Sequence, residues 1–321
     1  MKKKVFVILG QTATGKSDLA VKLAKKLDGE IISADSRQVY RGLDIGTGKI
    51  TKKEMRNVPH HLLDVASPKR RFTVAEYRKK AIYAIADIFK RGKTPIICGG
   101  TGFYIDTITK GTIFPAVPPN PKFRKSTSKL DGRQLLMLLE KLDPGRAKSI
   151  DKNNKVRLIR AIEIAKYLDQ VPRLVALPPS YEFVKIGLFL PQALLKKKIE
   201  SRVNKMFKAG LLKEIQKLKK SGVSAKRLRE LGFEYYNPTP EKVIAETLKY
   251  AKRQMTWFKR DKEIKWFDAS ENGMLFGRAM RESDPRHRFW RPKLYHLTNR
   301  PKLFLCFFVL GLFPAPFAVF F

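Results

Sequence analysis

Apolar runs alternate with helical periodicity along the first hundred residues of this chain. The apolar runs cover residues 5–9, 30–34 and 95–98, and each has the length of a buried strand. Between them, residues 18–27 and 72–90 repeat apolar side chains at intervals of three and four, which predicts helices. Thr73 and Glu76 have the spacing of a capping box at the start of the second helix. Strands that alternate with helices predict an α/β fold with a parallel sheet.

The pattern changes after residue 112. Residues 113–122 contain four prolines, which exclude a helix and indicate a linker. Residues 129–142 and 155–168 then show helical periodicity, with a break at Asp143-Pro144 between them. These two helices predict a small helical domain that is inserted into the α/β core.

An apolar run at residues 184–190 predicts that the chain returns to the core sheet. One helix is expected over residues 194–220 and a last core helix over residues 241–260. The domain boundaries follow from these patterns. We expect the first part of the core at 1–112, the inserted domain at 113–183, the second part of the core at 184–268 and a tail at 269–321.

The end of the tail, residues 303–321, is 19 residues long and has no charge, so it meets the length rule for a membrane span. Pro314 and Pro316 weaken a straight helix there. Three interpretations remain open: a C-terminal membrane anchor, a tail packed on the core, or a translation-frame artefact. We favour the artefact, because nothing else in the sequence requires a membrane, and we expect a cytoplasmic protein.

The composition of the chain shows a strong positive charge. The 321 residues include 67 Lys and Arg against 29 Asp and Glu, a net charge of +38, which favours binding to a polyanion. Hydrophobic residues form 43% of the chain, enough for a packed core. Cys98 and Cys306 are far apart and give neither a disulfide framework nor a metal cluster, which fits a reducing compartment.

The loop after the first predicted strand carries the clearest candidate chemistry. Its sequence, GQTATGKS, has two glycines separated by four residues and followed by Lys16 and Ser17, which is the phosphate-loop pattern. The glycines let backbone N–H groups face an anion, Lys16 adds a charge, and Ser17 is a candidate Mg²⁺ ligand. The loop comprises Gly10, Gln11, Thr12, Ala13, Thr14, Gly15, Lys16 and Ser17. It predicts a diphosphate or triphosphate ligand without identifying its carrier.

Two further candidates follow the next predicted strands. Asp35 follows residues 30–34, and Thr101 follows residues 95–98 and a pair of glycines. Ligands of open α/β sheets bind at the carboxyl ends of the strands, so both residues are expected near the phosphate loop. Asp35 is a candidate base or Mg²⁺ ligand, although a helix-capping role is an alternative. The absence of an acidic residue where Thr101 stands argues against plain ATP hydrolysis.

Four stretches together resemble the tRNA dimethylallyltransferases, also called tRNA isopentenyltransferases, of the IPP transferase family. They are GQTATGKS, ADSRQVYRGLDIGTGK, PHHLLD and PIICGGTGFY, in this order. The resemblance extends from Lys4 to about Asp268 and includes IESRVNKMFKAGL, NKVRLIRAIE and AKRQMTWF. Gln11 departs from the family, which usually has proline there; little effect is expected, because backbone amides form the phosphate cradle. The adjacent histidines of PHHLLD lack a third ligand nearby, so we expect a packed or hydrogen-bonded pair rather than a metal site.

The resemblance implies a P-loop NTPase-like parallel sheet with an inserted small helical domain. It also implies transfer of a dimethylallyl group from dimethylallyl diphosphate to N6 of adenosine 37, next to the anticodon of tRNA. Arg202 matches the family's arginine that helps to hold the diphosphate, and Asp35 would be the general base. Ser17 and Thr101 would help to place Mg²⁺, the expected cofactor. The catalytic set implied is therefore Asp35, Thr101 and Arg202.

Basic residues cluster in the predicted helix and loop over residues 196–229, which favours contact with nucleic acid. For any single basic residue, a solvated surface position remains the alternative. The expected tRNA contacts are Asp35, Ser36, Arg37, Gln38, Val156, Arg157, Leu158, Ile159, Arg160, Arg229, Lys252, Arg253 and Gln254. We expect the anticodon stem-loop of tRNA and dimethylallyl diphosphate as partners, no obligate protein partner, and a monomer.

Three other functions remain open. A prenyltransferase that acts on a free adenine nucleotide would need neither the inserted domain nor the large basic surface. A P-loop kinase for a small metabolite would not explain the DSRQ segment or the strand that ends without an acidic residue. A basic RNA-binding or membrane-tethered protein with a vestigial loop would leave Asp35 and Thr101 unexplained.

Overall fold

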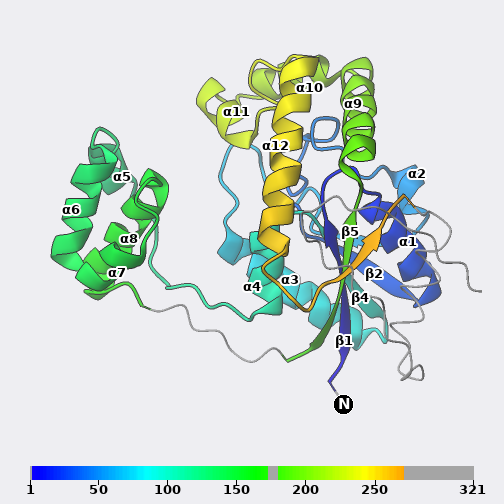
Figure 1. Ribbon diagram of the computed structural model, residues 1–321, viewed down its shortest axis with the longest axis horizontal. Helices are drawn as coiled ribbons and strands as arrows, with labels where there is room; N and C mark the ends of the chain where they lie inside the picture. Colours follow the sequence, from blue (N-terminus) through cyan, green and yellow to red (C-terminus); the bar gives the residue numbers. More distant parts are fainter. Residues whose placement is uncertain (1, 173–179, 271–321) are drawn as a thin grey trace, which may run out of the picture. The chain divides into compact units, whose positions relative to one another are not determined.

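The computed structural model describes residues 2–172 and 180–270, and its core is one parallel sheet (Figure 1). The strands are β1 (Lys4–Gly10), β2 (Gly29–Ser33), β3 (His60–His61), β4 (Thr94–Gly99), β5 (Glu182–Phe189) and β6 (Lys265–Asp268). They lie in the order β3-β2-β4-β1-β5-β6, and every neighbouring pair is parallel. The predicted α/β fold and the four strands predicted from apolar runs are confirmed. The edge strands β3 and β6 have two and four residues, too few for a periodic pattern.

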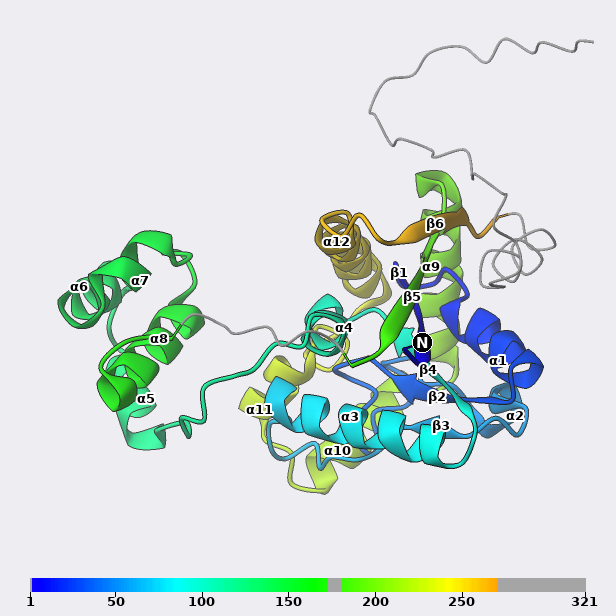
Figure 2. The same ribbon diagram turned by 90° about the horizontal axis from the view of Figure 1, so that it is seen from below.

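Both faces of the sheet are buried. Side chains alternate along β1, so that Val5, Val7 and Leu9 join one hydrophobic cluster while Phe6 and Ile8 join another. The first cluster includes residues of α3 (Val74–Lys90) and α4 (Gly102–Thr109), and the second includes residues of α1 (Lys16–Lys26) and α9 (Gln192–Lys208). Figure 2 shows α1 and α3 on opposite sides of the sheet. This arrangement leaves the carboxyl ends of the strands to the loops that carry the candidate residues.

Local signals set several helix boundaries. The capping box predicted at Thr73 and Glu76 is present and begins α3. The last core helix, α12 (Pro240–Phe258), begins with proline after a Thr239 cap. Two short helices, α2 (Lys52–Met55) and α11 (Ala225–Leu231), lie in connecting segments.

The prediction of one helix over residues 194–220 is wrong. The chain forms α9 and then α10 (Leu211–Lys220), because Gly210 adopts a φ of 97° and ends the first helix. Leu195 and Ile199 of α9 belong to one hydrophobic cluster, while Ile215 of α10 belongs to the other. Met206, near the end of α9, belongs to the same cluster as Ile215, so α9 contacts both clusters before the chain turns at Gly210.

Residues 121–168 form four helices with their own hydrophobic cluster. These are α5 (Pro121–Thr127), α6 (Gly132–Leu142), α7 (Pro144–Ser149) and α8 (Lys155–Leu168). The helices predicted over residues 129–142 and 155–168 correspond to α6 and α8. The short helices α5 and α7 were not predicted, because Pro121 and Pro144 indicated a linker and a break, whereas each proline stands in the first turn of a helix, where it is tolerated. Leu135 and Leu139 of α6 pack with Leu158 and Ile162 of α8. A separate cluster of this kind is what a small helical domain requires.

The apolar end of the tail, residues 303–321, lies outside the described residues. Within residues 2–172 and 180–270, no helix is long and apolar enough to cross a membrane.

Candidate active site

The phosphate-loop segment joins β1 to the N-terminus of α1, as the sequence predicts. Gly15 precedes the helix with a φ of 83°, a conformation that favours glycine. A Cβ atom on Gly10 would lie 2.1 Å from the carbonyl oxygen of Leu188, so a side chain has no room there. The Lys16 ammonium and the Thr14 hydroxyl both donate to the Gln11 carbonyl oxygen, which closes the loop.

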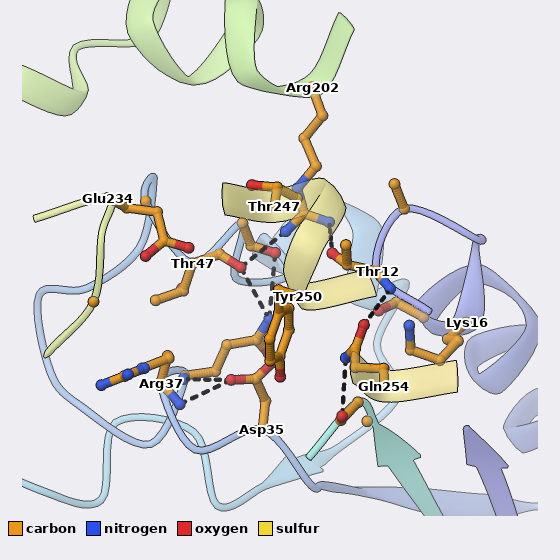
Figure 3. Close-up of a pocket in the computed structure, with 18 of the residues that line it drawn as sticks. Thr12, Lys16, Asp35, Arg37, Thr47, Arg202, Glu234, Thr247, Tyr250 and Gln254 are labelled. Atoms are coloured by element: carbon orange, nitrogen blue, oxygen red, sulfur yellow. Dashed lines mark hydrogen bonds between the residues drawn. The ribbon is translucent and has the colours of Figure 1, made fainter. Parts of the chain in front are cut away.

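Two half-buried cations face the cavity beside this loop (Figure 3). Burial, with a smaller contribution from Arg202, lowers the pKa of Lys16 to about 8. Burial also lowers the pKa of the Arg202 guanidinium below its usual range, although Asp35 and Glu234 oppose this effect. An anion placed between them would relieve the cost of burying both charges. The electrostatics therefore favour a diphosphate or a similar anion.

Asp35 begins the turn that follows β2. Its Oδ1 accepts hydrogen bonds from the backbone N–H groups of Arg37 (2.8 Å) and Gln38 (3.3 Å), which is the local capping role that the sequence left open. Both of these bonds go to Oδ1, and the other carboxylate oxygen, Oδ2, takes part in neither. The Asp35 side chain also lines the cavity, so its carboxylate is a candidate base for a ligand bound there.

Thr101 reaches the same place from the end of β4. Gly99 makes this possible, because a Cβ atom there would lie 2.2 Å from the carbonyl oxygen of Ala34. The Thr101 hydroxyl accepts from the Ser36 N–H at 3.0 Å and is hydrogen-bonded to Tyr250. The Thr101 hydroxyl therefore holds the turn that follows Asp35, and the residues that line the cavity include Asp35 but not Thr101.

Arg202 extends from α9 into the cavity. Its Nη2 donates to the Thr47 carbonyl oxygen at 2.9 Å, and its Nη1 lies 3.5 Å from the Thr12 hydroxyl of the phosphate loop. The guanidinium therefore bridges the loop and a turn nearly thirty residues further along the chain. Gln38 Nε2 contacts the carbonyl oxygens of Thr47 and Gly48 at 3.4 Å, which brings it to the same turn.

Gln254 lies elsewhere than the sequence suggested. Its side chain is buried, with Oε1 accepting from the Thr12 N–H (2.8 Å) and Nε2 donating to the Gly100 carbonyl oxygen (2.9 Å). A direct tRNA contact would require this side chain to leave both partners. Its position instead ties α12 to the phosphate loop and to the end of β4.

The cavity is also lined by residues outside the sequence-based set, among them Tyr250 and Glu234. Tyr250 lies one helical turn before Gln254 on α12, and burial raises the pKa of its hydroxyl to about 12. Glu234 lines the side of the cavity near Arg37, and burial raises the pKa of its carboxyl to about 7. Helical spacing from Gln254 could have indicated Tyr250, and Glu234 ends the stretch LRELGFE, which itself resembles the family's sequence.

The cavity has a volume of about 470 Å³, within the range of small-molecule sites. Phosphate-loop residues and Lys16 form one part of the wall, and Asp35, Arg37 and Gln38 form another. A diphosphate and a second reactant beside Asp35 would therefore contact different walls of one space.

The predicted tRNA contacts outside the cavity differ in exposure. Arg229, Lys252 and Arg253 are exposed, and Arg229 stacks on Tyr236 with 4.3 Å between its guanidinium carbon and the ring centroid. Arg253 also lines the cavity.

The tRNA contacts predicted on α8 differ in burial, because one side of this helix packs into the hydrophobic cluster of α5–α8. Val156 and Arg157 are exposed, and Ile159 is partly buried. Leu158 is fully buried in the hydrophobic cluster of α5–α8, so its side chain contributes to packing. Arg160 is half-buried, with contacts to Glu163 and to the Val117 carbonyl oxygen.

The residues near the cavity fit a magnesium ion that takes most of its ligands from a diphosphate. Ser17 is exposed at the start of α1 and offers a hard hydroxyl oxygen, as Mg²⁺ requires. Within the described part of the chain, no group of three His, Cys, Asp or Glu side chains forms a dedicated metal cage. The adjacent histidines make separate contacts, His60 with the Val58 carbonyl oxygen and His61 with Glu30.

Comparison with known proteins relates this site to one family. Residues 38–261 match the family model described as IPP transferase. The chain is 37% identical over 301 residues to the tRNA dimethylallyltransferase of Anoxybacillus flavithermus, covering 88% of this chain and 95% of the relative. It is 41% identical over 287 residues to the tRNA dimethylallyltransferase of Thermoanaerobacter sp., covering 82% and 91%.

Solved structures give the same relationship. A tRNA isopentenylpyrophosphate transferase from Staphylococcus epidermidis aligns with a TM-score of 0.63 at 33% identity, covering 88% of this chain and 98% of that chain. A eukaryotic dimethylallyltransferase described as acting on tRNA aligns with a TM-score of 0.70 at 27% identity, covering 83% and 74%.

Proposed function

This chain belongs to the IPP transferase family, and we propose that it transfers a dimethylallyl group from dimethylallyl diphosphate to N6 of adenosine 37 in tRNA. One observation supports this most directly. The phosphate loop and Arg202 face the same cavity as Asp35, so an anionic leaving group and a base for the acceptor are close together. The tRNA substrate and the prenyl-transfer reaction agree with the names of the relatives.

The donor end of the cavity is formed by the phosphate loop, Lys16 and Arg202. The loop amides and the two cations would bind the diphosphate and stabilise the negative charge that develops as the bond from carbon to oxygen breaks. Arg202 suits this role because its planar fork can donate to two phosphate oxygens. Mg²⁺, held beside Ser17, would add positive charge to the same diphosphate.

The acceptor end is formed by Asp35 and its neighbours. The N6 amine attacks the allylic carbon, the new bond from nitrogen to carbon forms, and Asp35 Oδ2 takes the proton that N6 loses. An exocyclic amine is a weak nucleophile, so alignment by Ser36, Arg37 and Gln38 matters as much as the base. The target adenine has to leave the base stack to reach this cavity.

The exposed basic residues Arg229, Lys252 and Arg253 would bind tRNA phosphates, together with Arg157 of α8. We further propose a cytoplasmic monomer that needs no protein partner, since a single chain supplies both ends of the cavity.

A prenyl-transfer assay tests the function. Purified protein with Mg²⁺ and labelled dimethylallyl diphosphate is incubated in parallel with unmodified tRNA, AMP and ATP. We expect label in tRNA alone, at N6 of adenosine 37. Label in AMP or ATP would indicate a nucleotide prenyltransferase, and consumption of ATP without transfer would indicate a kinase or ATPase.

A further inference from the structure

Glu214 is a buried carboxylate that the proposed mechanism does not use. It lies in the first turn of α10 and is only 9% exposed. Its Oε2 accepts from the backbone N–H groups of Asp44 (3.0 Å) and Ile45 (2.7 Å). Its Oε1 accepts from the N–H of Gly46 (3.1 Å) and from the Tyr235 hydroxyl (2.9 Å). Four donors therefore satisfy this buried charge, which would otherwise be costly.

The three N–H groups belong to one turn, which we call the Asp44–Gly48 turn. Gly46 packs closely against Tyr235, because a Cβ atom on Gly46 would lie 2.6 Å from the Tyr235 hydroxyl. Within the turn, the Thr47 hydroxyl donates to the Leu43 carbonyl oxygen at 2.6 Å. Glu214 and Tyr235 thus hold one side of the turn in a single conformation.

The other side of the same turn contacts Arg202. The Thr47 carbonyl oxygen accepts from Arg202 Nη2, and a Cβ atom on Gly48 would lie 2.1 Å from that nitrogen. Gly46, Thr47, Gly48 and Arg202 all line the cavity, and Glu214 lies behind the turn. The backbone of the turn therefore connects the Glu214 carboxylate to the guanidinium at the donor end.

We propose that Glu214 is a positioning residue, which fixes the Asp44–Gly48 turn and thereby holds the Arg202 guanidinium in place for the diphosphate. This inference rests on the proposed function, since it assumes that the donor diphosphate binds between the phosphate loop and Arg202. Glu214 does not touch the substrate. It acts by removing the freedom that a flexible arginine would have to lose on binding.

The carboxylate is essential to this role, because all four of its neighbours are donors. Glu214→Gln has nearly the same shape, but its NH₂ group has to face N–H or O–H donors on one side. The turn then loses partners for one or two N–H groups and can move. Tyr235→Phe is the milder change, since it removes one donor and leaves the three backbone bonds.

The test measures the binding of inorganic diphosphate with Mg²⁺ by calorimetry, together with steady-state prenyl transfer. For Glu214→Gln we expect about tenfold weaker diphosphate binding and a similar rise in the KM for dimethylallyl diphosphate. The KM for tRNA should stay within about twofold, because the turn does not form the exposed basic surface. Tyr235→Phe should change the same two quantities in the same direction by a smaller factor.

Glu30→Gln is the matched control. Glu30 is also a buried carboxylate, paired with Arg91 and hydrogen-bonded to His61, and these partners lie away from the Asp44–Gly48 turn. This variant should lower the melting temperature without changing diphosphate binding. A general effect of removing a buried carboxylate would instead weaken diphosphate binding in both variants.

A double-mutant cycle with Arg202→Ala identifies the route of the effect. If Glu214 acts through Arg202, adding Glu214→Gln to Arg202→Ala should weaken diphosphate binding by less than about twofold further. A full additional tenfold loss would overturn the inference, as would unchanged diphosphate binding in Glu214→Gln and Tyr235→Phe. Failure of the wild-type protein to bind diphosphate or to transfer the prenyl group would count against the proposed function instead.

Discussion

At the scale of single residues, the two oxygen atoms of Asp35 differ in their contacts. Oδ1 caps the turn that contains Arg37 and Gln38, while Oδ2 takes no part in these bonds and is the atom to which the proposed mechanism assigns the proton transfer. A substitution that removes both oxygens would therefore disturb the turn as well as the chemistry. Asparagine keeps an oxygen for the cap and removes the base.

Asp35→Asn should lower the single-turnover rate of prenyl transfer by about 10²- to 10⁴-fold, the usual range for a general base. The affinity for tRNA should stay within a few-fold, because the turn keeps its cap. Rapid-quench measurement with saturating donor and tRNA gives the rate, and a filter-binding assay gives the affinity. A near-normal rate would remove Asp35 from the base role.

Lys16 makes donor binding depend on pH. Burial lowers the pKa of Lys16 to about 8, so the free protein loses this charge as the pH rises through 8. The affinity for dimethylallyl diphosphate should therefore be constant below about pH 7 and fall by about tenfold between pH 7 and 9. Calorimetric titrations across this range measure the effect, and a constant affinity up to pH 9.5 would contradict it.

The same shift predicts the sign of a stability change. Because the pKa is lower in the folded protein than in the unfolded chain, the folded state binds fewer protons between about pH 8 and 10.5. Lys16 therefore makes the folded state relatively more stable as the pH rises across this window. The burial of Lys16 destabilises the folded state most below about pH 8, where Lys16 is charged in both the folded and the unfolded states.

At the scale of secondary-structure elements, the site depends on contacts between segments that are distant in sequence. Gln254 joins α12 to the phosphate loop and to the end of β4 through two hydrogen bonds. Glu214 joins α10 to a turn 170 residues earlier in the chain. The phosphate loop is thus supported by elements from the second half of the core.

Gln254→Ala should lower the free energy of unfolding by about 1–3 kcal/mol, because the Thr12 N–H and the Gly100 carbonyl oxygen lose their partner. It should also raise the KM for dimethylallyl diphosphate, since Thr12 belongs to the phosphate loop. Denaturant titration and steady-state kinetics measure the two effects. Thr256→Ala, at an exposed position of the same helix, is the control and should change neither quantity.

Sequence patterns predict the elements of this core better than they predict its contacts. The phosphate loop, the sheet and the capping box of α3 depend on neighbours within a few residues, so local periodicity and spacing indicate them. The break at Gly210 was missed because apolar positions continue at helical intervals across it. Glu214 could not be found in this way, because a carboxylate in a basic helix looks like a surface residue until the fold buries it. Glu234 lies in LRELGFE, a stretch that resembles the family, but the resemblance gave this carboxylate no role of its own.

The same limit explains the assignments to tRNA. A run such as VRLIR on α8 shows which residue types are present, but Leu158 faces a hydrophobic core while Arg157 faces solvent. Gln254 was grouped with its basic neighbours by sequence, whereas the helical turn directs it inward. The direction in which a side chain faces depends on where its helix packs, and a sequence motif alone does not show this.

At the scale of the whole molecule, the net charge of +38 gives a long-range attraction for tRNA that no single contact supplies. Figure 1 shows α10 beyond the end of the sheet where the strands finish, which is also the edge that carries the site. Lys213 and Lys217 are exposed one turn apart on α10. The proposed function brings the anticodon loop of tRNA to this edge, so we expect these two lysines to neutralise tRNA phosphates.

The double variant Lys213→Gln with Lys217→Gln tests this placement. Each lysine that neutralises a phosphate contributes roughly 0.7 to 0.9 to the slope of log affinity against log salt concentration. The double variant should bind tRNA more weakly at low salt, with a slope shallower by about 1.5, and should keep the KM for dimethylallyl diphosphate. The matched control is Lys25→Gln with Lys90→Gln, which removes the same charge from the ends of α1 and α3 that precede β2 and β4. Equal changes of slope in both double variants would mean that tRNA binding depends on the total charge of the protein and not on the lysines of α10.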